Sequence, residues 1–258
     1  MKRFLDTAAP WLVPVAILVL WQIGAESGII SHRLLPAPSD VAIAFWTMAK
    51  SGELWRDMWV STARALIGFA IGGSIGFVLG VLNGTSSTAA RLLDSSLQML
   101  RNIPHLAMIP LVILWFGIDE SAKLFLVSVG VFFPIYLNTY HGVRTVDAGL
   151  VEMARIYGLD RWRLFFEVIL PGALPSILVG FRYALGIMWL TLIVAETISA
   201  SSGIGYMTMN AREFLETDVV VLGILVYALL GKLADWATRW LEQSLIGWHP
   251  AYRAGAAP

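Results

Sequence analysis

Long apolar stretches recur along this sequence, and they limit the possible fold more than any other feature does. A helix that crosses a bilayer needs about 20 mostly apolar residues. Six stretches approach that length: 11–25, 63–82, 103–118, 122–140, 176–199 and 219–236. The third is short and contains Pro104 and Pro110, but prolines are tolerated in membrane helices whose neighbours satisfy the freed carbonyl groups. We therefore predict an all-α membrane protein with about six transmembrane helices.

The composition agrees with a membrane protein and excludes several kinds of site. Hydrophobic residues make up 57% of the chain and charged residues 14%, whereas soluble domains usually have about 25% charged residues. The formal net charge is zero, so no basic surface indicates nucleic-acid binding. Cysteine is absent and the four histidines lie far apart in the sequence, so we predict no disulfide, thiol nucleophile or metal centre.

The distribution of lysine and arginine predicts the topology. Lys2 and Arg3 precede the first apolar stretch, as in a signal peptide, but the later apolar stretches favour a retained first span. With the N-terminus inside, most basic residues fall in inner segments, Arg253 among them, and fewer in outer segments, Arg64 and Lys123 among them. Because inner loops are enriched in lysine and arginine, both termini of this multi-pass chain are predicted to be cytoplasmic.

The long outer loop, 26–62, predicts a short helix on the membrane surface. Pro36 and Pro38 favour an extended entry, and Ser39 or Asp40 can cap a following helix. Apolar residues then recur at helical spacing: Val41, Ala44, Phe45 and Met48. Such a stripe is typical of a helix that lies in the membrane interface.

Glycine recurs every four residues in the second apolar stretch. The glycines are Gly68, Gly72, Gly76, Gly80 and Gly84. Because residues four apart share a face of a helix, they form a smooth ridge that lets another helix approach closely. We interpret the ridge as a close packing surface, with a moving contact between pore helices as the alternative.

The segment 143–175, between the fourth and fifth apolar stretches, predicts a cytoplasmic helix–turn–helix. Two amphipathic stripes follow one another: Leu150, Met153, Ala154 and Tyr157, then Trp162, Phe165, Phe166 and Ile169. Gly158 lies between the stripes, and Asp147 and Asp160 stand at the expected N-caps. Pro171 and Pro175 are predicted to close the unit before the fifth span. The pattern fits a docking element for a soluble partner and an amphipathic loop on the lipid headgroups equally well.

This segment resembles the cytoplasmic EAA signature of binding-protein-dependent ABC importers. That signature combines a Glu-Ala-Ala triplet, a glycine, an isoleucine and a Leu-Pro pair at fixed spacing. The matching residues are Glu152, Ala154, Gly158, Leu170 and Pro171. Met153 and Val168 depart from it by mild apolar exchanges. The stretches 35–38, 101–105, 114–117, 194–196 and 202–206 also resemble the nitrate, taurine and sulfonate permease family, and 104–107 and 209–214 look closest to its aliphatic-sulfonate permeases.

The resemblance implies a fold like that of type I ABC importer permeases. The whole chain, 1–258, would be one transmembrane permease domain, with 143–175 as its cytoplasmic coupling segment and with Glu152 and Gly158 at the centre of the ATPase-coupling contact. The resemblance further implies a homodimeric pore in the bacterial inner membrane, two ATP-binding subunits that hold ATP and Mg, and a periplasmic substrate-binding protein. The implied substrate is a small organic anion, most closely an aliphatic sulfonate, with taurine and nitrate as alternatives.

The chain is predicted not to be an enzyme. It has no Gly-x-x-x-x-Gly-Lys-Ser/Thr phosphate loop, so ATP hydrolysis must come from another chain. A membrane enzyme would show a catalytic motif such as His-Glu-x-x-His, and none is present. An ion-coupled secondary transporter would show an internal repeat and carboxylates near the midplane, and neither is evident.

Polar residues near the spans are candidates for a translocation path: Arg101, Asn102, His105 and Glu196. An anion needs cationic or hydrogen-donating groups along its path, and ionisable groups within spans are functional candidates. For Glu196, a pore-facing position and a structural ion pair are equally compatible with the sequence. Arg182 is expected to reach the interface by snorkelling, and Lys232 and Asp235, three residues apart, are expected to neutralise each other.

Overall fold

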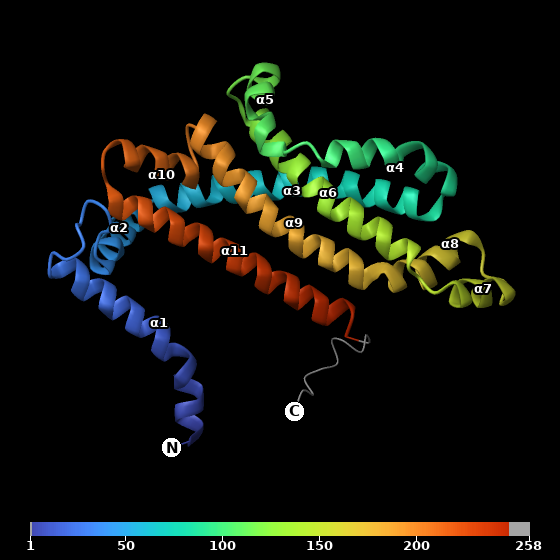
Figure 1. Ribbon diagram of the computed structural model, residues 1–258, viewed down its shortest axis with the longest axis horizontal. Coiled ribbons are helices and arrows are strands. Elements are labelled where there is room, and N and C mark those ends of the chain that lie inside the picture. Colours follow the sequence, from blue (N-terminus) through green and yellow to red (C-terminus); the bar gives the residue numbers. More distant parts are fainter. Residues whose placement is uncertain (1, 248–258) are drawn as a thin grey trace. The chain divides into compact units, whose positions relative to one another are not determined.

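The computed structural model describes residues 2–247, in which helices are joined by turns and loops and no strand occurs (Figure 1). Side chains are described from Leu12 onward, with the exception of Ser199. The α-helices are α1 (Lys2–Glu26), α2 (Pro38–Ser51), α3 (Glu53–Thr85), α4 (Ser87–Arg101), α5 (Ile109–Phe116), α6 (Glu120–Arg144), α7 (Ala148–Ile156), α8 (Arg161–Leu164), α9 (Leu170–Ser199), α10 (Ile204–Glu213) and α11 (Thr217–Leu245). A 3-10 helix, His105–Met108, precedes α5, and a π-helix, Phe165–Ile169, precedes α9. The predicted all-α fold class is confirmed.

Four helical segments in the described residues are long and apolar enough to cross a membrane. They are α3, α6, α11 and the continuous stretch Arg161–Ile198, which contains most of α9. These segments contain the second, fourth, sixth and fifth predicted spans respectively. Their length and apolar composition suit a bilayer, which a helix can cross because it satisfies its own backbone polar groups.

The third predicted span does not form a membrane-crossing helix by itself. Residues His105–Phe116 reach the length and hydropathy of a span only together with α4, and the two parts are bent by 78°. Pro104 stands at the bend, where it lacks an N–H and forces the preceding residue out of helical geometry. The first predicted span lies in α1, whose apolar described part, Leu12–Glu26, is shorter than a full span. The total of six spans therefore stays a prediction.

The chain divides into two compact units, Met1–Ser61 with Ser201–Ala228, and Thr62–Ala200 with Leu229–Pro258. Helices α3 and α11 each contribute one end to the first unit and the remainder to the second. The assignment of 1–258 to a single permease domain stays a prediction.

In the first unit, side chains of α1 and α3 satisfy the backbone of their neighbours. Gln22 on α1 donates from Nε2 to Ser39 Oγ at 3.0 Å and accepts from the Ser39 N–H at 3.1 Å. Asp57 on α3 accepts from the Gly203 N–H at 3.0 Å, and Ser61 accepts from the Ile204 N–H at 2.9 Å. Because the first N–H groups of a helix have no partner within it, these two α3 side chains fix the start of α10.

Helix α2 begins two residues earlier than it would if Ser39 were its N-cap. Its N-cap is Ala37 and Pro38 is its first residue, a position where the missing N–H of proline costs nothing. Asp40 accepts instead from the Ala37 N–H at 3.2 Å. Val41 and Ala44 of the predicted surface stripe are buried within the unit, and Phe45 is exposed, so only part of the stripe remains free for a membrane surface.

In the second unit, the glycine ridge of α3 lies directly against α6. A Cβ added at Gly76 would lie 2.6 Å from the Phe132 carbonyl oxygen, and one at Gly84 would lie 2.7 Å from Val143 Cβ. The other three glycines face α6 in the same way, at Val127 for Gly68, Ser128 for Gly72 and Thr139 for Gly80. Ser128 also donates to the Gly68 carbonyl across the contact at 3.1 Å. The absent side chains let the two backbones approach closely, as expected for helices that associate inside lipid.

Helices α6 and α9 pack along much of their length. Val143, Ala173 and Ile177 form a buried cluster near the ends that adjoin the coupling segment. Gly142 and Gly180 each lie against the other helix, at the Ala173 carbonyl and at Asn138. Ser176 donates to the Asn138 carbonyl at 2.8 Å. This packing holds the two ends of the segment 143–175 in place.

Candidate functional site

The first arm of the coupling segment ends in a left-handed glycine, as predicted. Asp147 caps α7 by accepting from the Gly149 N–H at 2.7 Å. At the other end, Leu159 N–H donates to the Ala154 carbonyl at 3.1 Å and Gly158 N–H donates to the Arg155 carbonyl at 3.0 Å. These two bonds form a Schellman motif, which requires a positive φ at the glycine, and Gly158 has φ +79°. A Cβ at Gly158 would meet no atom within 4 Å, so glycine is required there by backbone conformation alone.

The second arm differs from the prediction. Asp160 caps α8 by accepting from the Arg163 N–H at 2.8 Å, but Pro171 and Pro175 do not end the arm. Instead the chain passes through the π-helix Phe165–Ile169 straight into α9, which contains both prolines. Pro171 lacks the N–H that would continue the helical hydrogen bonds, and the wider π turn just before it accommodates this change, with the Leu170 N–H bonded to the Phe165 carbonyl. The second arm is therefore continuous with the helix of the fifth predicted span.

Apolar side chains on both arms are exposed. Tyr157 is 78% and Trp162 73% exposed, and Leu150, Met153, Ile156 and Phe166 are also exposed. Ala154 and Leu164 are buried. Glu152 is exposed, and Leu170 and Pro171 are half-buried. Large exposed apolar groups that lie close together on a surface mark an interaction site.

A cavity of about 650 Å³ lies beside the second arm. Its lining combines apolar residues with two arginines: Val81, Thr85, Arg155, Arg161, Trp162, Leu164, Phe165 and Ile169. The C-terminal end of α3 thus contributes to the surroundings of the coupling segment, which the sequence alone did not reveal.

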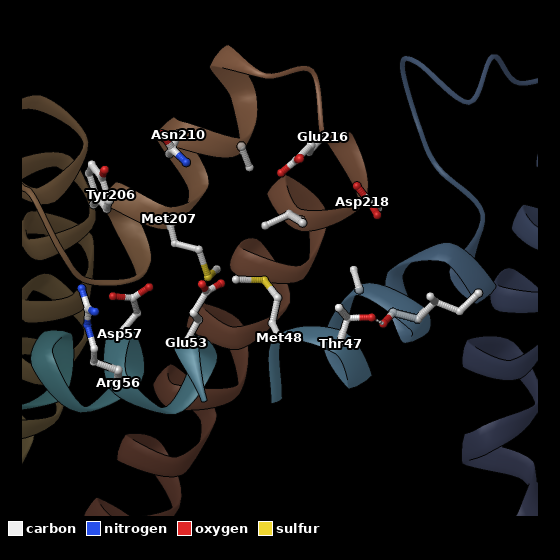
Figure 2. Close-up of a pocket in the computed structure, with 14 residues that line it drawn as sticks. Thr47, Met48, Glu53, Arg56, Asp57, Tyr206, Met207, Asn210, Glu216 and Asp218 are labelled. Atoms are coloured by element: carbon white, nitrogen blue, oxygen red, sulfur yellow. Dashed lines mark hydrogen bonds between the residues drawn. The ribbon is translucent and has the colours of Figure 1, made fainter. Parts of the chain in front are cut away.

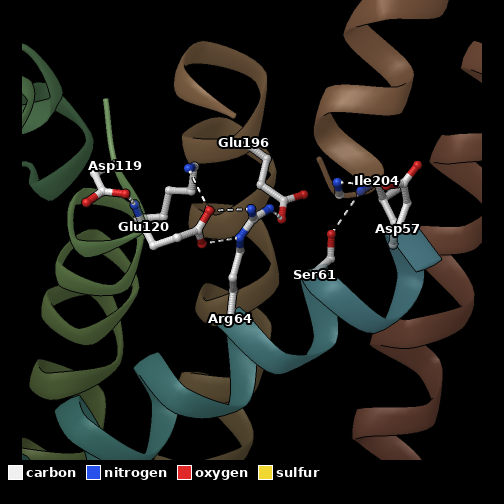
Figure 3. A network of polar contacts seen from close by, with 9 residues as sticks. Asp57, Ser61, Arg64, Asp119, Glu120, Glu196 and Ile204 are labelled. Atoms are coloured by element: carbon white, nitrogen blue, oxygen red, sulfur yellow. Dashed lines mark hydrogen bonds and ion pairs between the residues drawn. The ribbon is translucent and has the colours of Figure 1, made fainter. Parts of the chain in front are cut away.

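A buried ion network joins α3, α6 and α9 (Figure 3). Arg64 donates from Nε and Nη2 to the two carboxylate oxygens of Glu120 at 2.6 and 2.5 Å, and from Nη1 to Glu196 at 2.7 Å. Lys123 adds an ion pair to Glu120 at 3.2 Å. The Glu196 side chain is 0% exposed and that of Glu120 is 51% exposed. For Glu196, the structure therefore shows an ion pair.

Arg64 and Lys123, which the sequence assigned to outer segments, are not loop residues. Both lie inside helices and their side chains are almost completely buried. The signal that could have placed them is the presence of Glu196 in a predicted span, because a buried carboxylate needs a cationic partner.

The other translocation-path candidates differ in burial. Arg101 is the exposed last residue of α4, and Asn102 is its exposed C-cap. His105 is half-buried and forms a hydrogen bond between Nε2 and Thr191 Oγ1 at 3.1 Å. Only His105 of these three therefore reaches into the helix packing, where it joins the bent segment to α9.

Arg182 is ion-paired rather than simply snorkelling. Its Nη2 donates to Glu242 Oε2 at 2.5 Å, and its Nε lies 3.9 Å from Asp235 Oδ1. Lys232 lies 3.8 Å from Asp235, as predicted, and Arg239 lies 3.0 Å from the same carboxylate. The two Arg182 pairs join α9 to α11, and the Lys232 and Arg239 pairs lie within α11.

A separate cavity of about 490 Å³ lies within the first unit (Figure 2). Its polar lining is mainly acidic: Glu53, Asp57, Glu216 and Asp218, with Arg56, Asn210, Tyr206 and Thr47. Like charges repel, so this cavity is a poor site for a free anion. Between residues 2 and 247, no group of three or more histidine or acidic residues is arranged to hold a metal ion.

Sequence comparisons identify a family and full-length relatives. The sequence model of the family described as binding-protein-dependent transport system inner membrane component matches residues 72–247. An aliphatic sulfonates transport permease protein of Escherichia coli K12 is 63% identical over 252 residues, which cover 98% of this chain and 96% of that protein. One of Bacillus subtilis 168 is 46% identical, with coverages of 93% and 87%. The taurine transport system permease protein of E. coli K12 is 36% identical, with coverages of 90% and 86%.

Solved structures share the fold. An inward-facing form of the MetNI methionine ABC transporter has a TM-score of 0.55 and 21% identity, and the match covers 70% of this chain and 92% of that one. An amino acid ABC transporter crystallised with histidines has a TM-score of 0.57 and 16% identity, with coverages of 77% and 96%. At these identities the comparison shows the fold alone, and that fold is the one of type I importer permeases.

Proposed function

The chain belongs to the family of binding-protein-dependent transport system inner membrane components, and we propose that it carries aliphatic sulfonates as the permease subunit of an ATP-driven importer. Two relatives, at 63% and 46% identity, are described as aliphatic sulfonates permeases, and the relative described for taurine is 36% identical. The order of identities favours aliphatic sulfonates over taurine. Like its permease relatives, the chain is a transport subunit and not an enzyme.

The observation that carries this function is the exposed coupling segment. A permease without an ATP-binding loop must receive force from another chain through a rigid contact. Asp147, Gly158 and Asp160 fix the shape of the segment, and its second arm continues into α9. Motion imposed on the exposed apolar residues would therefore pass directly into a membrane helix.

The partners follow from the family. In our proposal two ATP-binding subunits, which hold ATP and Mg, contact the coupling segment around Glu152 and Gly158. A second copy of this chain completes the pore, and a periplasmic binding protein delivers the anion. The path candidates Arg101, Asn102 and His105 stay proposals, and Glu196 acts through its ion pair with Arg64.

The proposed location is the bacterial inner membrane, with both termini cytoplasmic. The inner position of the coupling segment agrees with the basic residues Arg144, Arg155, Arg161 and Arg163 in and beside it. Lys2 and Arg3 have no described side chains, and residues 248–258, which include Arg253, lie outside the described residues.

Growth on defined sulfur sources tests the proposal. A strain that lacks this gene should fail to grow on ethanesulfonate as sole sulfur source, grow normally on sulfate, and recover with the gene restored. Uptake of labelled ethanesulfonate into vesicles with the full transporter should exceed uptake of taurine or nitrate. Normal growth of the deletion strain on every alkanesulfonate, or faster uptake of taurine or nitrate than of ethanesulfonate, would contradict the substrate assignment.

A further inference from the structure

A small polar cavity between α4 and the end of α6 is lined by two arginines that form no ion pair with any described residue. The cavity has a volume of about 360 Å³ and is lined by Ser87, Ala90, Arg91, Asp94, Ser95, Tyr140 and Arg144. In the part of the chain that the structure describes, neither Arg91 nor Arg144 has a carboxylate within 4.0 Å. Two exposed guanidinium groups beside one cavity attract an anion from outside the chain.

Existing contacts orient both arginines without using up their donors. Arg91 donates from Nε to the Ser87 carbonyl at 3.3 Å. Arg144 donates from Nη1 to Tyr140 Oη at 2.9 Å, and its guanidinium lies over the Tyr140 ring, 5.6 Å from the centroid. Each guanidinium carries five N–H donors, so several remain for a ligand. The hydroxyl groups of Ser87 and Ser95 can add further hydrogen bonds.

The one carboxylate in the lining is already engaged. Asp94 Oδ1 accepts from Tyr136 Oη at 3.3 Å, and Tyr136 accepts in turn from Asn83 at 2.8 Å. The formal charge of the lining is still positive, with two arginines against one aspartate. The cavity therefore favours an oxyanion, such as a phosphate or sulfonate group.

The rest of α4 indicates which anion this is. Its polar face, with Ser87, Arg91 and Ser95, borders the cavity. The neighbouring face exposes Leu92 (73%) and Met99 (72%), which are seven residues apart and so lie on one side of the helix. An amphipathic helix of this kind lies in the membrane interface. A ligand with an anionic head and an apolar tail would match both faces.

We propose that this cavity binds the phosphate headgroup of an anionic phospholipid, with the acyl chains along Leu92 and Met99. Basic pockets at the ends of transmembrane helices on the cytoplasmic side are known recognition sites for such headgroups. The C-terminal end of α6 lies on the side that the predicted topology assigns to the cytoplasm. The site is independent of the identity of the transported substrate.

Lipid binding to the purified transporter tests the proposal. The full-length chain, co-purified with its ATP-binding subunit, would be titrated with dioleoylphosphatidylglycerol and observed by native mass spectrometry. Arg91→Gln and Arg144→Gln should each weaken binding about fivefold, the effect of one basic residue near a membrane surface. Arg91→Lys, which keeps the charge, should stay near wild type. Arg33→Gln is the control, because Arg33 is also exposed but does not line the cavity.

Three outcomes would overturn the proposal. The first is wild-type lipid binding by both glutamine variants when their gel-filtration profiles show intact complexes. The second is equal binding of dioleoylphosphatidylcholine, because a zwitterionic headgroup lacks the net charge. The third is binding of inorganic phosphate together with no binding of phosphatidylglycerol, which would make the cavity a site for a soluble anion.

Discussion

Arg64 donates from Nη1 to Glu196 at 2.7 Å, and this bond joins α3 to α9 between two almost completely buried side chains. Glu120, at the start of α6, accepts hydrogen bonds from Nε and Nη2 of the same guanidinium. Its side chain is half exposed. The two carboxylates thus share one arginine but differ in their access to solvent. That difference allows their contributions to be separated experimentally.

Glu196→Gln should destabilise the chain more than Glu120→Gln. Removing one partner of a buried pair leaves an uncompensated charge and costs about 3 kcal/mol or more, whereas an exposed pair contributes about 1 kcal/mol or less. Thermal unfolding of both variants in the same detergent measures the difference. Arg64→Met combined with Glu196→Met should recover part of the loss, because the pair is then replaced by apolar groups. Equal unfolding temperatures for the two single variants would contradict the burial argument.

The sequence could not predict this network, because its partners are far apart along the chain. Arg64 and Glu196 are separated by 132 positions, and no local pattern links them. The caps at Asp147 and Asp160 and the left-handed Gly158 were predicted because each depends on a few neighbouring residues. The bend at Pro104 and the continuation of α8 into α9 were missed, because apolar length alone does not distinguish a straight helix from a bent or joined one.

Gly76→Leu should disrupt the packing of α3 on α6. A Cβ there would lie 2.6 Å from the Phe132 carbonyl oxygen, which is backbone and cannot rotate away. Overpacking of this kind costs about 1–3 kcal/mol. Gly186→Leu in α9 is the matched control, because a Cβ at Gly186 meets no atom within 4 Å. Folded yield and unfolding temperature should fall for Gly76→Leu and stay at the wild-type values for Gly186→Leu. A Gly76→Leu protein that folds and transports normally would show that this contact is not required.

The isolated chain should not hydrolyse ATP. It contains no phosphate-binding loop of the Gly-x-x-x-x-Gly-Lys-Ser/Thr type. A phosphate-release assay on the purified chain should give the background rate, and addition of the ATP-binding subunit should restore activity. Hydrolysis above background by the chain alone, after removal of contaminating ATPases, would contradict its assignment as a transport subunit.

Gly158→Val should uncouple transport from ATP hydrolysis. Gly158 has φ +79°, where a β-branched residue is strained by roughly 1–2 kcal/mol. The space around Gly158 is open, so steric contact does not contribute and the effect comes from the backbone. Relaxation of that strain would break the bonds from Gly158 and Leu159 to α7 and change the angle between the two arms. Membrane insertion should survive, because the apolar helices are unchanged.

Gly158→Asn is the control that isolates this mechanism, since asparagine tolerates the left-handed conformation far better than valine does. In reconstituted vesicles, Gly158→Val should lose transport and co-purify poorly with the ATP-binding subunit, while Gly158→Asn should keep most of both. Glu152→Ala should give a milder loss, because it removes one exposed charge and leaves the bend intact. Wild-type transport and co-purification for Gly158→Val would mean that the segment 143–175 is not the coupling element. Equal loss in Gly158→Asn would instead place the defect in the side chain at the partner's surface, because that variant keeps the conformation of the bend.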